Sequence, residues 1–247
     1  MLPEMLRKLK NRVTHRPDTN AIAAYRDHCT THSTDANEWA SQIDADIWKE
    51  SLEFAQSQRS LADRVLQQIP VKLGGGGFYA LLYFITRIAR PTTIVETGVA
   101  AGFSSRAFLK SIEVNDHGRL ISSDFPYIRF DNPERYIGVL VEPEIRCNWT
   151  LLIGCDRRNL PLIAEEAGEI DLLHYDSDKT VEGRNFALQS LEKNITSSTI
   201  VVFDDIQDNL HFRDYVAASN REHLIFEFLG KYIGFVPPLH STKWNRK

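Results

Sequence analysis

The fold of this chain is decided by Thr93-Ile94-Val95-Glu96-Thr97-Gly98-Val99-Ala100-Ala101-Gly102-Phe103-Ser104-Ser105. Apolar and β-branched residues lead into an acid, and small residues follow at once. Beyond Gly102 the apolar residues recur every three to four positions, as in a helix: Phe103, Ala107, Phe108 and Ile112. The stretch therefore predicts a buried strand, a tight loop and the start of a helix. Free backbone N–H groups and the positive end of a helix dipole at such a junction suit a partly anionic ligand.

The spacing of the glycines excludes two common nucleotide-binding loops. A dinucleotide fingerprint needs Gly-x-Gly-x-x-Gly, and Ala100 stands where the second glycine belongs. A P-loop needs a lysine at the helix start, and none lies between Glu96 and Arg106. What remains is Glu-x-Gly-x-x-x-Gly-x-Ser, which resembles the first motif of class I S-adenosylmethionine-dependent methyltransferases. The resemblance implies cofactor contacts from Glu96, Gly98, Ala100, Gly102 and Ser104, with the acid near the ammonium end of the ligand.

The composition is that of an ordinary globular chain, with 247 residues, 43% hydrophobic content and a formal charge of −4. We assign residues 1–72 to a helical cap or arm and residues 73–247 to the S-adenosylmethionine-binding domain. No apolar run is long enough to span a bilayer, and Met1 to Arg16 lacks the apolar core of a signal peptide. Three cysteines without metal-ligand spacing argue against a zinc site or a disulfide framework. We expect a cytoplasmic protein without a membrane or nucleic-acid partner.

The segment before the first strand is predicted to be helical. Apolar residues recur at helical spacing from Asp44 to Ile69, and Pro70 marks the stop. We interpret this helix as a cap, through which the chain could form a homo-oligomer. The run Gly74–Gly77 is entropically too costly for an element interior. It is either a flexible hinge or a segment whose backbone passes close to the ligand, and the strongly apolar helix Phe78 to Ile88 follows it.

Two further strands carry candidate cofactor ligands. Arg119–Asp124 ends in an acid at the distance from the glycine loop where a ribose-binding carboxylate is expected. Trp149–Ile153 leads into Asp156, in a segment that resembles the family's Gly-Asp/Ser-x-x-x-x-Leu-Pro pattern. That resemblance implies that Asp156 faces the adenine amino group. Residues 126–148, between these strands, have no clean period and are interpreted as part of a substrate cover.

The remaining elements complete the predicted sheet. Ile170–Asp176 and Thr199–Asp205 are strands separated by a helix from Val181 to Leu191, and residues 224–236 form a hairpin. We predict an α/β fold: a Rossmann-like class I methyltransferase sheet of seven mostly parallel strands, with a C-terminal antiparallel hairpin, flanking helices and an N-terminal helical cap. Ligands in such sheets lie over the carboxyl ends of the strands. Acids stand at or just beyond five of these ends: Glu96, Asp124, Asp156, Asp176 and Asp204.

The acids after the fourth and fifth strands suggest a metal site. Asp176, Asp204 and Asp205 would lie close together and repel one another, and a hard divalent ion such as Mg²⁺ would remove the repulsion. The segments Asp176–Lys179 and Asp204–Asp205 resemble those of metal-dependent, catechol-type O-methyltransferases. By that resemblance the three acids hold the metal, Asp176 also lies in the catalytic and cofactor-binding site, and Lys179 is the general base.

Other interpretations of these segments remain. Asp-Asp after a strand is also common turn chemistry, and Asp-x-x-Lys also suits a helix start with a solvated lysine. Asp205 stands where catechol-type enzymes carry asparagine, which fits sugar and macrolide O-methyltransferases at least as well. His174 is interpreted as a core histidine, and His211 as a weaker candidate for a base or substrate contact. Nothing separates Arg184 from surface residues.

The predicted function is divalent-metal-assisted O-methylation of a hydroxyl on a small molecule such as a sugar, a polyketide or another natural product. The predicted cofactors are S-adenosylmethionine and Mg²⁺ or another divalent cation. Two alternatives come from other classes of protein: a metal-independent N- or O-methyltransferase, and a scaffold that binds S-adenosylmethionine without catalysis. A hydroxylase-like relative is a more distant one.

Overall fold

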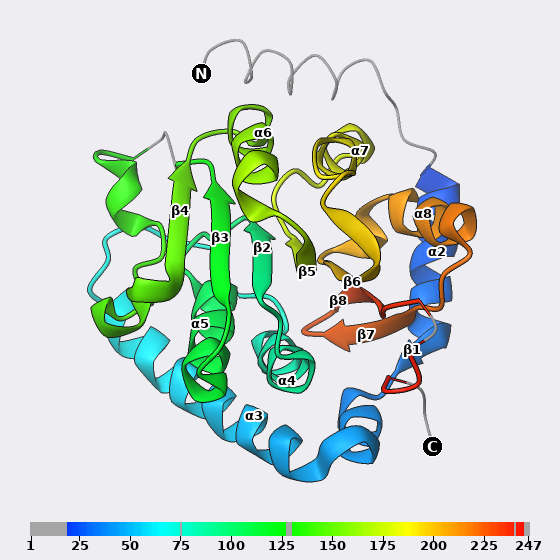
Figure 1. The fold of residues 1–247 in the computed structure, drawn as a ribbon, viewed down its shortest axis with the longest axis horizontal. Helices are drawn as coiled ribbons and strands as arrows, with labels where there is room; N and C mark the ends of the chain where they lie inside the picture. The colour runs from blue at the N-terminus through cyan, green and yellow to red at the C-terminus, as the bar shows by residue number, and fades with distance from the viewer. Residues whose placement is uncertain (1–18, 75, 127–129, 240, 245–247) are drawn as a thin grey trace.

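The computed structural model describes residues 19–74, 76–126, 130–239 and 241–244, built around one mixed sheet (Figure 1). Its strands are β1 (Ser33–Thr34), β2 (Thr93–Thr97), β3 (Arg119–Asp124), β4 (Trp149–Ile153), β5 (Ile170–Tyr175), β6 (Ile195–Phe203), β7 (Leu224–Phe228) and β8 (Lys231–Val236). Their order across the sheet is β1-β7-β8-β6-β5-β2-β3-β4. Strands β2 to β6 run parallel, and β8 runs antiparallel to both β6 and β7. The predicted fold is confirmed, and the short β1, which pairs with β7, adds one strand to the predicted seven.

Helices cover both faces of the sheet (Figure 1). They are α2 (Thr19–His32), α3 (Ala36–Leu66), α4 (Tyr79–Ala89), α5 (Phe103–Asn115), α6 (Asp156–Ala167), α7 (Val181–Ser190) and α8 (His211–Ser219). Side chains alternate between the two faces along each strand. Ile94 therefore packs with α3, α4 and α5, whereas Val95 packs with α2, α6, α7 and α8. The five residues of β2 are all buried, as expected for a central strand covered on both sides.

The long helix α3 covers most of the predicted cap helix and begins eight residues before it. The backbone of Asp44 is not helical, and its Oδ1 accepts a hydrogen bond from the backbone N–H of Ile47 at 2.9 Å. Asp44 thus caps a second helical segment, which is why the sequence signal begins there. The predicted start at Asp44 is therefore confirmed for this segment, whereas the predicted end near Ile69 was wrong, because the helix ends at Leu66. The helix packs against α4, and the predicted boundary at residue 72 stays a prediction. No described helix is long and apolar enough to cross a membrane.

The segment between β3 and β4 forms two short 3-10 helices, η1 (Pro133–Tyr136) and η2 (Pro143–Asn148). Its chain lies against the glycine loop, where the N–H groups of Gly138 and Leu140 donate to the carbonyls of Ala100 and Ala101, each at 2.9 Å. Residues 127–129 of the predicted substrate cover lie outside the described residues. The described part supports the glycine loop, and its role as a cover stays a prediction.

Candidate functional site

The glycine loop closes tightly over the end of β5. Gly98 has a φ of +84°, and a Cβ placed on it would lie 2.5 Å from the carbonyl oxygen of Asp176. Gly102 has a φ of +95°, and its Cβ would lie 2.9 Å from the Cα of Gly138. Neither position can carry a side chain without a shift of the backbone. Ala100 also adopts a positive φ, of 48°, which is uncommon for a residue with a Cβ.

Glu96 lies beneath this loop and is fully buried. Its carboxylate accepts hydrogen bonds from the hydroxyls of Ser104 at 2.5 Å, Ser105 at 2.6 Å and Ser122 at 2.8 Å. Burial raises the pKa of Glu96 to about 7, although the three hydroxyls act in the opposite direction. The carboxylate thus ties β2 to α5 and β3. Its full burial does not favour the predicted contact of Glu96 with the ligand's ammonium group.

Asp124, at the end of β3, and Asp156, just after β4, lie near each other. Asp124 accepts hydrogen bonds from the backbone N–H groups of Ala100 and Phe125, each at 2.8 Å. Burial raises the pKa of Asp124 to about 6, and the charge of Asp156 contributes. Asp156 accepts from the hydroxyl of Ser123 at 3.3 Å and from that of Ser177 at 2.5 Å. The structure thus brings both predicted cofactor ligands to the end of the sheet that carries Gly98.

Asp176, Asp204 and Asp205 form an acid cluster at the ends of β5 and β6. One carboxylate oxygen from each residue lies within 4.8 Å of the others. The structure therefore brings together the three predicted metal ligands, which come from two neighbouring strands. Asp204 and Asp205 are buried, with exposed fractions of 3% and 7%. Burial raises the pKa of Asp204, and the neighbouring Asp205 adds to the rise.

Two lysines accompany the acid cluster. Lys179 contacts Asp176, and its Nζ lies 3.0 Å from Oδ2 of Asp205. Lys231, from β8, lies 3.0 Å from Oδ1 of the same carboxylate. Burial alone would raise the pKa of Asp205, but the two lysines hold it below its ordinary value. Burial lowers the pKa of Lys179, whereas Asp204 and Asp205 act to raise it.

The glycine run before α4 also reaches the acid cluster. A Cβ on Gly77 would lie 3.2 Å from Oδ2 of Asp204, and a Cβ on Gly76 would lie 2.5 Å from the Cβ of Phe103. Of the two interpretations of Gly74–Gly77, close approach of backbone to the site is the one that these contacts favour. Gly75 lies outside the described residues.

Several groups around the site were missed or left undecided from the sequence. Arg184 is fully buried beneath the acid cluster, and the signal for it was its place beside Gly183 and three residues before Ala187 on the buried face of α7. Lys231 had no local signal, because only the pairing of β8 with β6 brings it near Asp205. His174 is a core residue as expected, and burial lowers its pKa to about 3. His211 is buried at the start of α8, which argues against its interpretation as a base or substrate contact.

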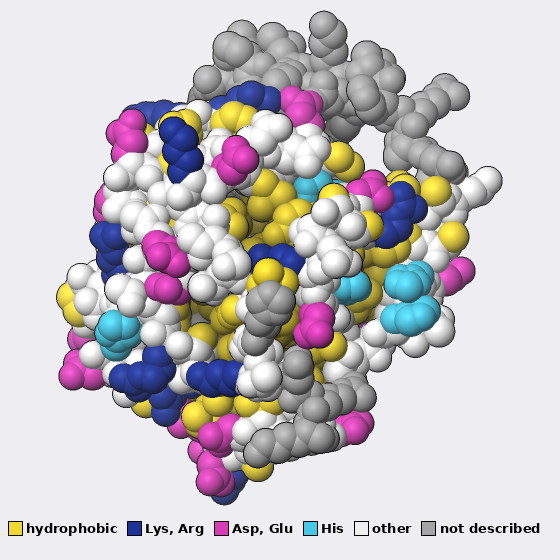
Figure 2. Space-filling view, turned by 45° about the vertical axis from the view of Figure 1, so that its right-hand side comes forward, with side chains coloured by type: hydrophobic (Ala, Val, Ile, Leu, Met, Phe, Trp, Pro, Cys, Tyr) yellow, Lys and Arg dark blue, Asp and Glu magenta, His cyan; other side chains and the backbone are white. Residues whose placement is uncertain are grey.

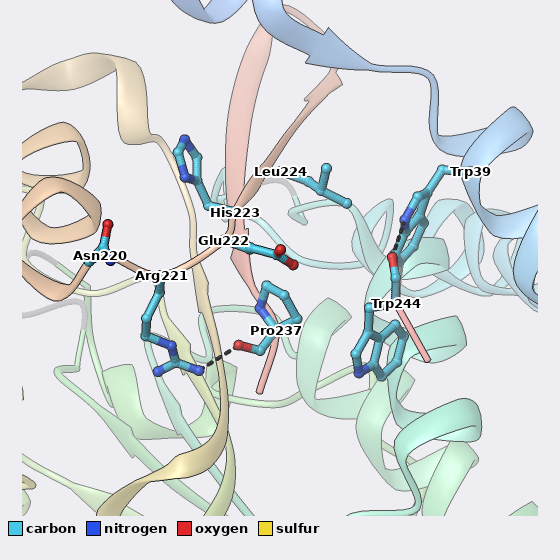
Figure 3. A pocket seen from close by; sticks show the side chains of 8 residues that line it. All are labelled: Trp39, Asn220, Arg221, Glu222, His223, Leu224, Pro237 and Trp244. Carbon is cyan, nitrogen blue, oxygen red and sulfur yellow. Dashed lines mark hydrogen bonds between the residues drawn. The ribbon is translucent and has the colours of Figure 1, made fainter. Parts of the chain in front are cut away.

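A separate cavity of about 580 Å³ lies away from this site (Figure 3). Leu224 at the start of β7 and Pro237 just after β8 line it, so it opens at the sheet end opposite the acid cluster. In Figure 3 an N–H of Arg221 donates to the carbonyl of Pro237 at 2.6 Å, and the indole N–H of Trp39 donates to the carbonyl of Trp244 at 3.3 Å. The cavity shares no residue with the predicted site.

The sheet order, the glycine loop and the acids at the strand ends define a class I methyltransferase fold, whose ligand site lies over the carboxyl ends of the strands. Residues 95–206 match a family described as a methyltransferase domain. Residues 95–206 are thus a methyltransferase domain, and the sheet that contains them has the class I methyltransferase fold. None of the curated proteins compared with the chain matches it.

Solved structures of methyltransferases share the fold. An O-methyltransferase from Bacillus cereus in complex with S-adenosylhomocysteine is 15% identical, with a TM-score of 0.53 over 85% of this chain and 99% of that one. A methyltransferase from Geobacter sulfurreducens is 16% identical, with a TM-score of 0.53 over 74% of this chain and 87% of that one. An S-adenosylhomocysteine-bound methyltransferase from Podospora anserina is 12% identical, with a TM-score of 0.50 over 90% of this chain and 97% of that one. At these identities the likeness establishes the fold.

Proposed function

We propose that this methyltransferase transfers the methyl group of S-adenosylmethionine to a hydroxyl of a small molecule, with a divalent cation held by the acid cluster. The observation that carries the proposal is the convergence of Asp176, Asp204 and Asp205 within 4.8 Å, with Lys179 in contact with two of them. The structural likeness to an enzyme named an O-methyltransferase supports transfer to oxygen.

The residues of the site fit both S-adenosylmethionine and a divalent cation. Around the glycine loop, Gly98 and Gly102 let the backbone approach a ligand, and the carboxylate of Asp124 lies beside it. S-adenosylmethionine, when bound, supplies a methyl group on a positively charged sulfur. In the acid cluster, one carboxylate oxygen each of Asp176, Asp204 and Asp205 lies within 4.8 Å of the others, which is the donor set of a hard divalent cation. Carboxylate oxygens are the ligands that Mg²⁺ prefers, and a bound cation lowers the pKa of an acceptor hydroxyl.

The chain's own groups then have defined tasks. The acids would orient the acceptor at the ends of β5 and β6, and the glycine loop would hold the donor over the end of β2. Nζ of Lys179 would take the hydroxyl proton as the neutral amine, a form that its burial favours. Glu96 would act on the cofactor through the loop, because all of its carboxylate contacts are internal.

One observation favours metal-independent transfer as a second candidate. Lys179 and Lys231 both contact Asp205 and already supply positive charge to the acid cluster. In that case the lysines would take over the charge neutralisation that a cation otherwise provides.

The kinds of side chain on the molecular surface support the proposed class of acceptor. On the face drawn in Figure 2, acidic and basic side chains are interspersed around a hollow lined by hydrophobic ones. This mixture supports a small-molecule acceptor, since nucleic acids need a continuous basic surface. A homo-oligomer formed through the N-terminal helices stays part of the proposal.

Calorimetric titration with S-adenosylhomocysteine, with and without Mg²⁺ and a panel of catechol and sugar-like acceptors, tests this function. We expect micromolar binding of S-adenosylhomocysteine, and acceptor binding only when Mg²⁺ is present. Acceptor methylation that survives complete chelation would support the metal-independent candidate. Failure to bind S-adenosylhomocysteine would overturn the placement of the cofactor, and cofactor binding without turnover on any acceptor would point to a scaffold.

A further inference from the structure

Arg184 lies directly beneath the acid cluster and is fully buried. Its Nη2 donates hydrogen bonds to the backbone carbonyl oxygens of Asp204, at 2.8 Å, and of Asp205, at 3.0 Å. One guanidinium nitrogen therefore holds the backbone of two consecutive acids, at the point where β6 ends and the short helix η3 (Ile206–Asp208) begins.

The backbone at this point is unusual in a way that matters for the acids. Consecutive side chains of a strand point to opposite faces, so an extended chain would separate the carboxylates of Asp204 and Asp205. Asp205 instead adopts a left-handed conformation, with φ of 51° and ψ of 45°. This conformation is strained for a residue with a Cβ, and it accompanies the approach of both carboxylates to Asp176. A contact that stabilises the turn therefore stabilises the geometry of the acid cluster.

Packing alone does not explain a buried arginine at position 184, because burial of its charge is unfavourable. It lies on the buried face of α7 together with Gly183 and Ala187, and a charged group there loses its hydration. Its Nε and Nη1 have no hydrogen-bond partner among the described residues. Replacing such a buried charge by an apolar side chain of similar volume is often neutral or stabilising. The two hydrogen bonds to the acid pair explain an arginine at this position better than packing does.

We propose that Arg184 is a positioning residue that holds Asp204 and Asp205 in the arrangement that binds a divalent cation. This inference rests on the proposed metal-assisted function. The positive charge of Arg184 by itself opposes a second cation nearby, so the proposal predicts that geometry outweighs charge. Removal of Arg184 should therefore weaken cation binding. If only the positive charge of Arg184 mattered, its removal would instead strengthen cation binding.

The experiment is calorimetric titration of the full-length protein with Mn²⁺, without acceptor, for the unmodified protein and for Arg184→Met and Arg184→Lys. We expect Arg184→Met to weaken Mn²⁺ binding by about tenfold or more, the effect typical of removing a group that orients a metal ligand. Arg184→Lys should recover part of the loss, because it keeps one donor. Affinity for S-adenosylhomocysteine should stay unchanged in both, which separates a local effect from a general loss of structure.

A matched control is Arg157→Met, which removes a half-exposed arginine that is paired with Glu182 at the start of α7. We expect no change in Mn²⁺ affinity from this variant. Equal or tighter Mn²⁺ binding by Arg184→Met would overturn the inference and leave the metal site standing. If the unmodified protein bound no Mn²⁺, the proposed metal site would fall and the inference with it.

Discussion

A Cβ at Gly98 would lie 2.5 Å from the carbonyl oxygen of Asp176 and would clash with it. Gly98, the first glycine of the loop, is thus in backbone contact with Asp176, the first of the three acids, across the pairing of β2 with β5. This contact joins the proposed donor site to the proposed acceptor site. The close approach of the loop to Asp176 depends on the absence of a side chain at Gly98.

We therefore expect Gly98→Ala to impair both stability and cofactor binding. The positive φ alone costs about 1–3 kcal/mol for a residue with a Cβ, and the clash with a backbone atom adds to that cost. Gly168→Ala is the control, because Gly168 also has a positive φ, of 66°, but nothing lies within 4 Å of its Cβ position. Chemical unfolding should show a loss in both variants, and only Gly98→Ala should lose S-adenosylhomocysteine affinity, by at least about tenfold. Equal affinities in the two variants would contradict the loop's place in the cofactor site.

Glu96 should make the stability of the protein fall as pH rises. Burial raises its folded-state pKa to about 7, from an ordinary value of 4.5, so the folded state binds more protons than the unfolded state between these two pH values. Stability must therefore decrease through this window, by roughly 3 kcal/mol for a shift of this size. Glu96→Gln cannot ionise and should lose this part of the slope. Urea unfolding of both proteins at several values between pH 4.5 and 8 measures it, and identical slopes would mean that Glu96 stays ionised throughout.

Asp124→Asn should weaken cofactor binding by about tenfold or more, because an NH2 group, which cannot accept a hydrogen bond, replaces one of the two oxygens that accept backbone N–H groups. The raised pKa of Asp124, about 6, also predicts that S-adenosylhomocysteine affinity falls below pH 6 in the unmodified protein and not in the variant. Titration calorimetry at pH 5 and pH 8 tests both statements. Asp116→Asn, at an exposed position after α5, serves as the control and should bind normally. Normal binding by Asp124→Asn would remove Asp124 from the ligand site.

Much of this site was predictable because the signals are local. A β-branched run that stops at an acid defines a strand and its carboxyl end, so β2, β3 and β5 were placed within a residue or two of their observed bounds. The parallel arrangement then brings the ends of β5 and β6 together, which is why the acid cluster could be predicted.

What could not be predicted depends on contacts between distant segments. Strand β6 begins at Ile195, four residues before the predicted start, because its polar first residues carry no strand pattern. Lys231 reaches Asp205 only through the antiparallel pairing of β8 with β6. The hydroxyls of Ser105 and Ser122 that surround Glu96 come from an adjacent helix and strand, so the sequence near Glu96 does not signal these hydrogen bonds.

The two lysines of the acid cluster should have separable effects on catalysis. Lys179 is the more buried, with 29% of its side chain exposed against 53% for Lys231, and it alone contacts both Asp176 and Asp205. If it takes the acceptor's proton, Lys179→Met should lower kcat by at least about 100-fold and leave S-adenosylhomocysteine affinity unchanged. Lys231→Met removes a half-exposed lysine that contacts only Asp205, so its effect should stay below about fivefold. Steady-state kinetics at saturating cofactor measures both, and equal losses would show that Lys179 serves to neutralise Asp205 and not to move a proton.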